Sequence, residues 1–143
     1  MPNSRANDHR IASKFKIEIE GVTQGAFAAM EGLESTTEVV RFADGDDILD
    51  RKRPGRTHYS NIVLKRGFVN SNELWDWYKA VIAGKVQRKA GSVILCADDG
   101  SEVMRFNFFE AWPCRWKSFV MDASRTAAMV EELEIAVEKI ERG

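Results

Sequence analysis

The residues with the clearest potential for chemistry lie between positions 44 and 56. Four carboxylates come first, at Asp44, Asp46, Asp47 and Asp50. Carboxylates this close together could bind calcium, but the ligand spacing of an EF-hand loop and its closing glutamate are absent. The sequence therefore predicts neither a metal site nor a cofactor here.

A basic run, Arg51-Lys52-Arg53-Pro54-Gly55-Arg56, follows the acidic residues directly. Alone it could bind phosphate groups, and a solvated surface loop is the simplest interpretation. One segment with a negative half and a positive half also suits a head-to-tail contact between copies of a chain, because opposite charges fix the register. We therefore take these residues as candidate contacts between subunits: Asp44, Asp46, Asp47, Asp50, Arg51, Lys52, Arg53 and Arg56.

The remaining reactive side chains form no recognisable catalytic group. The chain has no phosphate loop, nucleophile elbow or zinc-protease motif. His9 and His58 are expected on the surface, and Cys96 and Cys114 are expected to be buried, reduced thiols because they lack zinc-site spacing. The sequence thus predicts a protein that is not an enzyme.

Size and composition indicate one globular domain. The chain has 143 residues, 44% of them hydrophobic, and a formal net charge of -1. A charge so close to zero gives no overall basic field to draw the protein onto nucleic acid or lipid. Neither a signal-like start nor an apolar run long enough to span a bilayer is present, so we expect synthesis in the cytoplasm and no membrane anchor.

The periodicity of apolar residues predicts mostly strands. Residues 1–12 are expected to form a flexible N-terminal extension, and residues 14–20 alternate as a half-buried strand. Further strands are expected at residues 35–42 and 61–66, with a long polar loop over residues 43–56 between them. Residues 92–97 and 102–112 should form a hairpin, after which Pro113 should break or bend the chain before a last segment at residues 116–121.

One helix is predicted, over residues 71–83. Its apolar stripe would bury Leu74, Trp77, Tyr78, Val81 and Ile82. Asn70 is the expected N-cap and Gly84 the expected C-terminal glycine. Residues 130–140 fit a helix and a strand equally well, since helical spacing and strict alternation coincide there. The fold class is mainly β, an antiparallel barrel or sandwich with one packed helix and a long loop between strands.

Several segments resemble the tail tube proteins of contractile phages and of related phage-tail-like injection systems. They are the strand at residues 15–22, the Gly32-Leu33 turn, Pro54-Gly55 followed by residues 59–67, and Leu74-Trp75-Asp76-Trp77. Trp112-Pro113-Cys114-Arg115-Trp116 and residues 121–135 complete the resemblance. It spans almost everything from Lys14 to Arg142, so it covers the whole domain.

The resemblance implies a β-barrel subunit that assembles as stacked hexameric rings, with strands joined across subunits into an inner barrel. It implies a strand at the C-terminus, and it implies that the loop over residues 43–56 reaches neighbouring subunits and the adjacent ring. The implied partners are the chain itself, a contractile sheath protein, baseplate and spike proteins, a tape-measure protein, and DNA or effector cargo in the lumen. The particle would be a virion tail or an injection device.

Two further hypotheses follow from the residues. Alternation at the C-terminus places Glu132, Glu134 and Glu138 opposite the apolar face, and a lumen lined by them would repel acidic cargo. The alternative function is a monomeric β-barrel module that binds a peptide or nucleic acid.

Overall fold

The computed structural model describes residues 14–69, 72–118 and 128–143. This part of the chain contains nine strands and one helix, α2. Their bounds are β1 Lys14–Ile19, β2 Val22–Glu31, β3 Ser35–Phe42, β4 Arg51–Tyr59, β5 Ile62–Val69, α2 Glu73–Ile82, β6 Lys89–Cys96, β7 Glu102–Ser118, β8 Ala128–Ala136 and β9 Lys139–Arg142.

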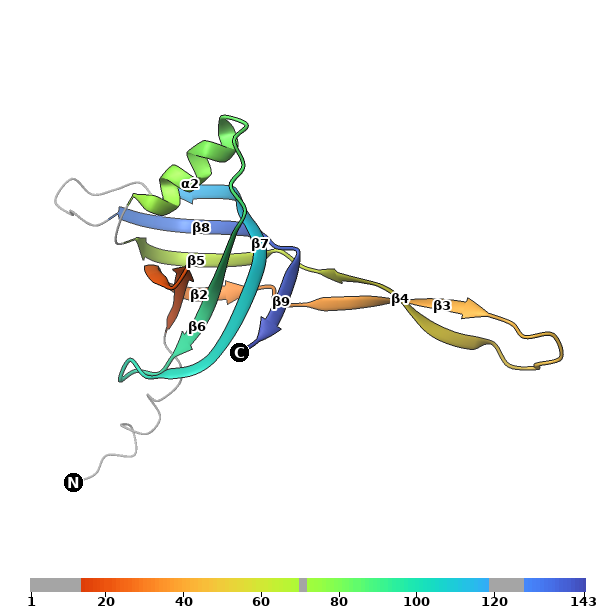
Figure 1. Cartoon of the computed structure of the whole chain (residues 1–143). Helices are drawn as coiled ribbons and strands as arrows, with labels where there is room; N and C mark the ends of the chain where they lie inside the picture. Colours follow the sequence, from red (N-terminus) through yellow and green to blue (C-terminus); the bar gives the residue numbers. More distant parts are fainter. Residues whose placement is uncertain (1–13, 70–71, 119–127) are drawn as a thin grey trace, which may run out of the picture.

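Six strands close into an antiparallel barrel, in the order β6-β1-β2-β5-β8-β7 with β7 returning to β6 (Figure 1). The length of β7 makes this closure possible, because it belongs to both walls. Its first part, from Glu102 to Ala111, pairs with β6, and its second part, from Trp112 to Ser118, pairs with β8. The short strand β9 pairs with residues 106–109 of β7. The prediction of a mainly β barrel with one helix is confirmed.

The strand β7 bends between its two parts without breaking. Glu110 has a positive φ of 52°, and the pairing with β8 shifts register between Pro113 and Arg115. Proline has no N–H to donate, and an irregularity of this kind is where a sheet tolerates it. The prediction that Pro113 bends the chain is confirmed. The prediction that it breaks the chain is wrong, because one strand continues through this buried residue. Residues 119–121 lie outside the described part.

The core follows the alternation of the strands. Ile17 and Ile19 of β1 are buried as predicted, and Phe15 packs against the same cluster. In β8, Leu133 and Ile135 are fully buried, while Glu132 and Glu134 lie on the other face. The C-terminal segment is thus a strand, as the resemblance implied, and the helical alternative is wrong.

The helix α2 packs two large side chains into the core of the barrel. Leu74 and Trp77 are buried, and the Trp77 indole Nε1 donates a hydrogen bond of 2.6 Å to the Gln87 carbonyl oxygen. Ile82 is 67% exposed, so its assignment to the buried stripe is wrong. The helix begins at Glu73 after Asn72, which makes no side-chain capping bond, and Asn70 lies outside the described residues. Gly84 follows the helix with a φ of 79°, as expected of a C-terminal glycine.

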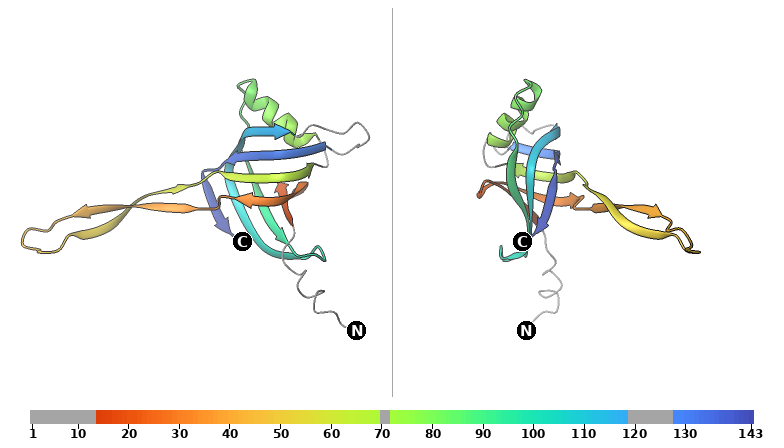
Figure 2. Two further views of the ribbon diagram at one scale, coloured as in Figure 1. Left: turned by 180° about the vertical axis from the view of Figure 1, so that it is seen from behind. Right: turned by 45° about the vertical axis from the view of Figure 1, so that its right-hand side comes forward.

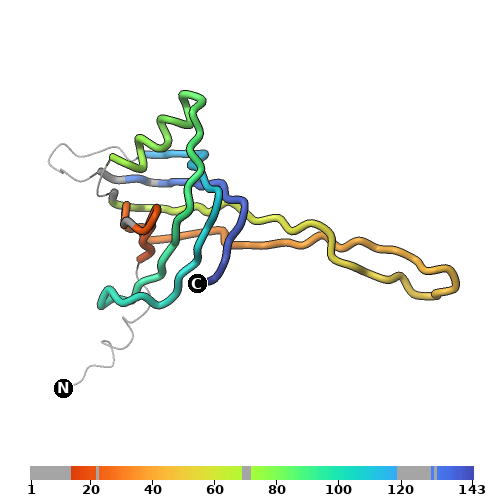
Figure 3. The backbone as a smooth tube through the Cα atoms, viewed as in Figure 1, coloured from red at the N-terminus to blue at the C-terminus, as the bar shows by residue number. Residues whose placement is uncertain are grey.

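The strands β3 and β4 form a separate two-stranded sheet, which we call the arm, and it projects far from the barrel (Figures 1 and 3). The predicted strand at residues 35–42 is confirmed. The predicted loop over residues 43–56 is wrong in its second half, because β4 begins at Arg51 and only residues 43–50 form the tip. Arg51, Lys52, Arg53 and Arg56 therefore lie on a strand. Pairing with β3 runs from Ser35 opposite Tyr59 to Phe42 opposite Arg51, with one register shift between Thr37 and Val39, and fixes their order along the strand.

Candidate assembly surfaces

The base of the arm is held to the barrel by its own backbone. Gly32 and Leu33 both have positive φ values, and a Cβ on Gly32 would overlap the Asn61 carbonyl oxygen. Two hydrogen bonds of 3.0 Å follow, from the Ser60 amide to the Glu34 carbonyl and from the Glu34 amide to the Ser60 hydroxyl. The direction in which the arm leaves the barrel is therefore determined by the local backbone.

Beyond this base the arm makes few stabilising contacts of its own. Every residue of β3 except Val40, and every residue of β4 except Tyr59, is exposed. The side-chain contacts along it include two polar pairs, Thr37 with Thr57 and His58 with Glu38, each at 2.9 Å, and a cation–π contact in which the Arg53 guanidinium lies 5.7 Å from the centre of the Phe42 ring. A two-stranded hairpin without a packed face is at best marginally stable in water. The arm is thus the kind of element that a second molecule would support.

The charged residues predicted from the sequence all lie in this arm. Asp44, Asp46, Asp47 and Asp50 are in the tip, and the four basic residues follow on β4. Arg51 already pairs within the chain, with its Nε and Nη2 atoms 2.9 and 3.2 Å from the Asp47 carboxylate oxygens. This pair raises the pKa of Arg51. Arg51 and Asp47 thus partly neutralise each other.

The tip also carries two apolar side chains that the charge pattern does not reveal. Ile48 is 99% exposed and Leu49 is 72% exposed. Single exposed apolar residues are common, but two adjacent aliphatic side chains at the end of an extended hairpin form a prominent contact point. Ile48 and Leu49 stand inside an acidic run, so no apolar periodicity marks them in the sequence.

A second surface is the outer face of β2, β5, β8 and the second part of β7. Leu64 and Leu133 point into the barrel, so their neighbours Lys65 and Glu132 lie on the opposite side. Glu132 lies 3.1 Å from Arg115 and 3.9 Å from Lys65, and Lys65 lies 2.8 Å from Glu31. The Glu31 pair raises the pKa of Lys65. This outer sheet face is polar and carries both signs of charge.

The three glutamates predicted to share one face occupy two different places. Glu132 and Glu134 lie on the outer sheet face, where Glu134 accepts a 2.8 Å hydrogen bond from the Asn61 side chain. Glu138 lies beyond the end of β8, in the turn to β9, and is 3.9 Å from Arg88. Strand alternation does not extend to Glu138, because β8 ends at Ala136.

Within the described part of the chain, the four strands under this face end in two edges that no further strand covers. Along β2, residues 22–27 pair with β1, whereas residues 28–31 pair with β5 alone among the described residues. Along β7, residues 112–118 pair with β8 and with no other described strand. Unpaired N–H and C=O groups at such edges are templates for pairing with another chain.

The remaining reactive side chains of the described residues are dispersed or buried. The described residues contain no group of three or more metal-binding side chains, and α2 is too short to cross a membrane. Both cysteines are free thiols, Cys96 buried and Cys114 half-buried. Trp75, Tyr78 and Trp116 contact one another, with ring centroids 5.2 to 6.4 Å apart, where α2 meets β7. His58 is exposed as predicted, and His9 lies outside the described residues.

Comparison with known families gives one decisive match. The profile of the family described as "T4-like virus tail tube protein gp19" matches residues 12–141, which is nearly the whole chain. The chain belongs to this family. This tail tube protein is therefore a structural tube subunit, and the resemblance read from the sequence is confirmed. No curated protein sequence matches it.

Solved structures show the same fold. In the sheath–tube complex of PVC, an extracellular contractile injection system in the extended state, a chain 21% identical superposes with a TM-score of 0.70, covering 100% of this chain and 99% of that one. The tube-terminating cap of the anti-feeding prophage gives 0.69 at 20% identity, covering 92% and 88%. Hcp1 from Flavobacterium johnsoniae gives 0.51 at 21% identity, covering 91% and 94%. The tail tube protein thus shares its fold with chains of these solved structures.

Proposed function

We propose that this tail tube protein assembles into hexameric rings that stack into the hollow inner tube of a contractile phage tail or injection system. The observation that carries the proposal is a pair of edges on one four-stranded sheet, at residues 28–31 of β2 and 112–118 of β7, that no further strand of the described residues covers. Joining the β2 edge of one subunit to the β7 edge of the next, repeated around a ring, closes the sheets into one large barrel without free edges.

In this arrangement the outer sheet face lines the lumen. Lys65, Arg115 and Glu132 pair on that face, so its charges are close to balance. A hydrated surface on which both signs already have partners gives a passing molecule few unmatched charges to bind. The lumen therefore passes cargo through balanced polarity, and the simple acidic lining expected from Glu132, Glu134 and Glu138 is replaced by this mixed one.

The arm supplies contacts between subunits through its charged residues. Asp44, Asp46 and Asp50 of one copy face basic groups of another, with Lys52, Arg53 and Arg56 available for this role. Arg51 and Asp47 also pair within the arm, so they contribute to its shape as well as to the contact. Charges of both signs on one exposed element select a register and oppose wrong docking.

The proposed partners are those expected of a subunit of a contractile tail tube. A contractile sheath surrounds the tube, a baseplate and spike stand at its end, and a tape-measure protein and DNA or effector proteins occupy the lumen. PVC and the anti-feeding prophage provide examples with sheath, baseplate and cap. The chain is synthesised and assembled in the cytoplasm and performs no catalysis, since its work is mechanical.

Size-exclusion chromatography combined with negative-stain electron microscopy tests the proposal. The purified chain is expected to form rings or tubes, at least at high concentration. A monomeric binding module is the competing function, and a chain that stays monomeric at every concentration and salt condition supports that module instead.

A further inference from the structure

The tip of the arm presents two exposed apolar side chains that its own chain does not cover. Ile48 and Leu49 are 99% and 72% exposed, and the tip backbone is held by hydrogen bonds from the Asp47 amide to the Asp44 carbonyl, at 2.7 Å, and from Arg51 to Asp47. The apolar pair is thus presented on a defined turn. An ordered presentation lowers the entropy that a contact must overcome.

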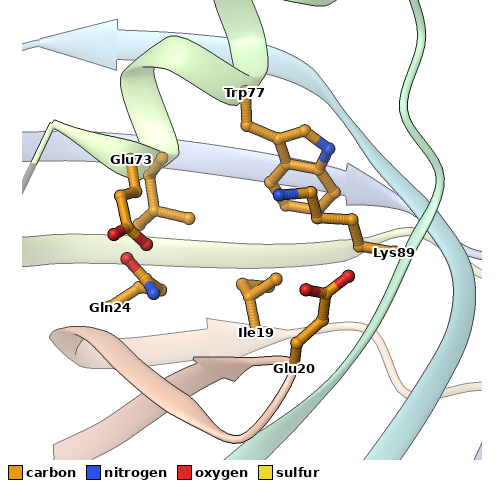
Figure 4. A pocket seen from close by; sticks show the side chains of 7 residues that line it. Ile19, Glu20, Gln24, Glu73, Trp77 and Lys89 are labelled. Carbon is orange, nitrogen blue, oxygen red and sulfur yellow. The ribbon is translucent and has the colours of Figure 1, made fainter.

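A cavity of about 130 Å³ lies between α2, the end of β1 and the start of β6 (Figure 4). Ile19, Leu74 and Trp77 supply its apolar wall, and the rest of its lining is the buried Gln24 together with Glu20, Glu73 and Lys89. The bond from Trp77 to Gln87 fixes the indole, and the Lys89 ammonium lies 6.0 Å from the centre of that ring. The cavity is therefore preformed, with an aromatic wall and charged groups of both signs.

The sizes of the two features agree. An apolar cavity of about 150 Å³ is large enough to hold benzene, so about 130 Å³ admits the four-carbon side chain of leucine or isoleucine. The charges are compatible as well, because Lys89 can approach Asp50, while Glu20 and Glu73 can approach Lys52 and Arg53 beyond the tip. The arm tip thus combines aliphatic side chains with charges of both signs, and the cavity combines an apolar wall with polar and charged residues.

Their positions exclude a contact within one chain. The arm leaves the barrel on one side, and the β1–β2 turn lies on the side away from it, in both views of Figure 2 as in Figure 1. When the arm tip and the cavity that receives it lie on opposite sides of a subunit, their contact is heterologous. Such a contact repeats from copy to copy and generates a ring or an open stack. The occupant that satisfies both features is a second copy of this chain.

We infer that Leu49 at the arm tip of one subunit inserts into the cavity lined by Ile19, Leu74 and Trp77 of another subunit, with Ile48 packed at the rim of that cavity. This inference rests on the proposed function, because it names the receptor for the arm in the assembled tube. It assigns the cavity beside α2 to assembly and not to a small ligand.

Cross-linking between two differently labelled chains tests the contact. One chain carries Leu49→Cys and the other carries Glu73→Cys, each with Cys114→Ser, and the two are mixed, assembled and oxidised. A disulfide forms only where the Cα atoms approach to about 4.4 to 6.8 Å. The matched control is Lys79→Cys, which is exposed on the same helix but does not line the cavity. We expect at least tenfold more cross-linked dimer with Glu73→Cys than with Lys79→Cys.

A second measurement uses the arm tip alone. The double variant Ile48→Ser, Leu49→Ser should raise the concentration needed for tube growth at least tenfold. The control Val103→Ser also removes an exposed apolar side chain, at a position 57% exposed on β7, and should leave that concentration unchanged. Assembly with equal cross-linking at positions 73 and 79, or an unchanged threshold in the double variant, overturns the inference and leaves the proposed function standing. A wild-type chain that never assembles removes both.

Discussion

Gly67 of β5 lies directly against the aromatic ring of Phe27 on the neighbouring strand β2. The two residues are opposite each other in the register, and a Cβ added to Gly67 would overlap three atoms of that ring. Phe27 is among the largest fully buried side chains of the core, so it cannot move aside freely.

Gly67→Ala should therefore destabilise the fold by overpacking, by about 1 to 3 kcal/mol. Gly55→Ala is a matched control, because that glycine also lies in a strand but its added Cβ would meet only Val40 and Glu38 of the exposed arm, at 3.0 to 3.1 Å. Chemical denaturation of both variants measures the difference. Equal free energies of unfolding for Gly67→Ala and wild type would show that the core yields at this point.

Trp77 provides the second prediction. Because it is 4% exposed and hydrogen-bonded to Gln87, Trp77→Ala removes both packing and a satisfied donor, and should cost about 3 to 5 kcal/mol. Ile82→Ala, on the exposed face of the same helix, should change stability by no more than about 0.5 kcal/mol. Thermal melts followed by circular dichroism compare the two. Similar melting temperatures for the two variants would remove Trp77 from the core.

Cys114 gives a prediction in pH. Burial, together with the negative charge of Glu134 and a hydrogen bond to it, raises the pKa of this thiol to about 11. In an unfolded chain the thiol pKa is about 8.5. The folded protein therefore keeps this proton to higher pH, so the thiol's contribution to stability is complete below about pH 8.5 and is lost as the pH rises toward 11.

Thiolate absorbance in a Cys96→Ala background follows this titration directly. The folded protein should titrate well above pH 9, and Glu134→Gln should lower the midpoint, because it removes the nearby negative charge. A midpoint near 8.5 in the folded protein would contradict the assigned environment of Cys114.

The arm gives a prediction that separates folding from assembly. Changing Arg51, Lys52 and Arg53 together to Glu should leave the barrel folded, because all three side chains are exposed. It should suppress tube growth, since three contacts change sign in every subunit, although one exposed pair is worth only about 0 to 1 kcal/mol. Circular dichroism checks the first expectation and negative-stain microscopy the second. Tubes of full length from this variant would exclude the arm charges from holding subunits together.

Much of the barrel was predictable because its strands alternate clearly. The segments at β1, β5, β6 and the first part of β7 have strong period-two patterns or β-branched residues, and their prediction as strands is confirmed. The pattern fails at β2, where Gly25, Ala26, Ala28 and Ala29 leave little contrast between faces. That strand is specified by its neighbours β1 and β5, which no local pattern records.

The arm was harder to predict for a physical reason. Arg51–Tyr59 contains a proline, a glycine and four basic residues, and only Tyr59 in it is even partly buried, so no burial pattern can reveal a strand. The pairing with β3 makes it one. The charged residues of the candidate contact were found from their spacing, whereas Ile48 and Leu49 were missed, because exposure at a hairpin tip is a property of the fold.

Electron cryomicroscopy of tubes grown from the purified chain tests the central claim most directly. The proposal predicts stacked hexameric rings in which residues 28–31 of one subunit pair with residues 112–118 of the next, and in which Lys65, Arg115 and Glu132 face the lumen. Tubes whose lumen is lined by another face, or a chain that remains monomeric under every condition, would contradict it.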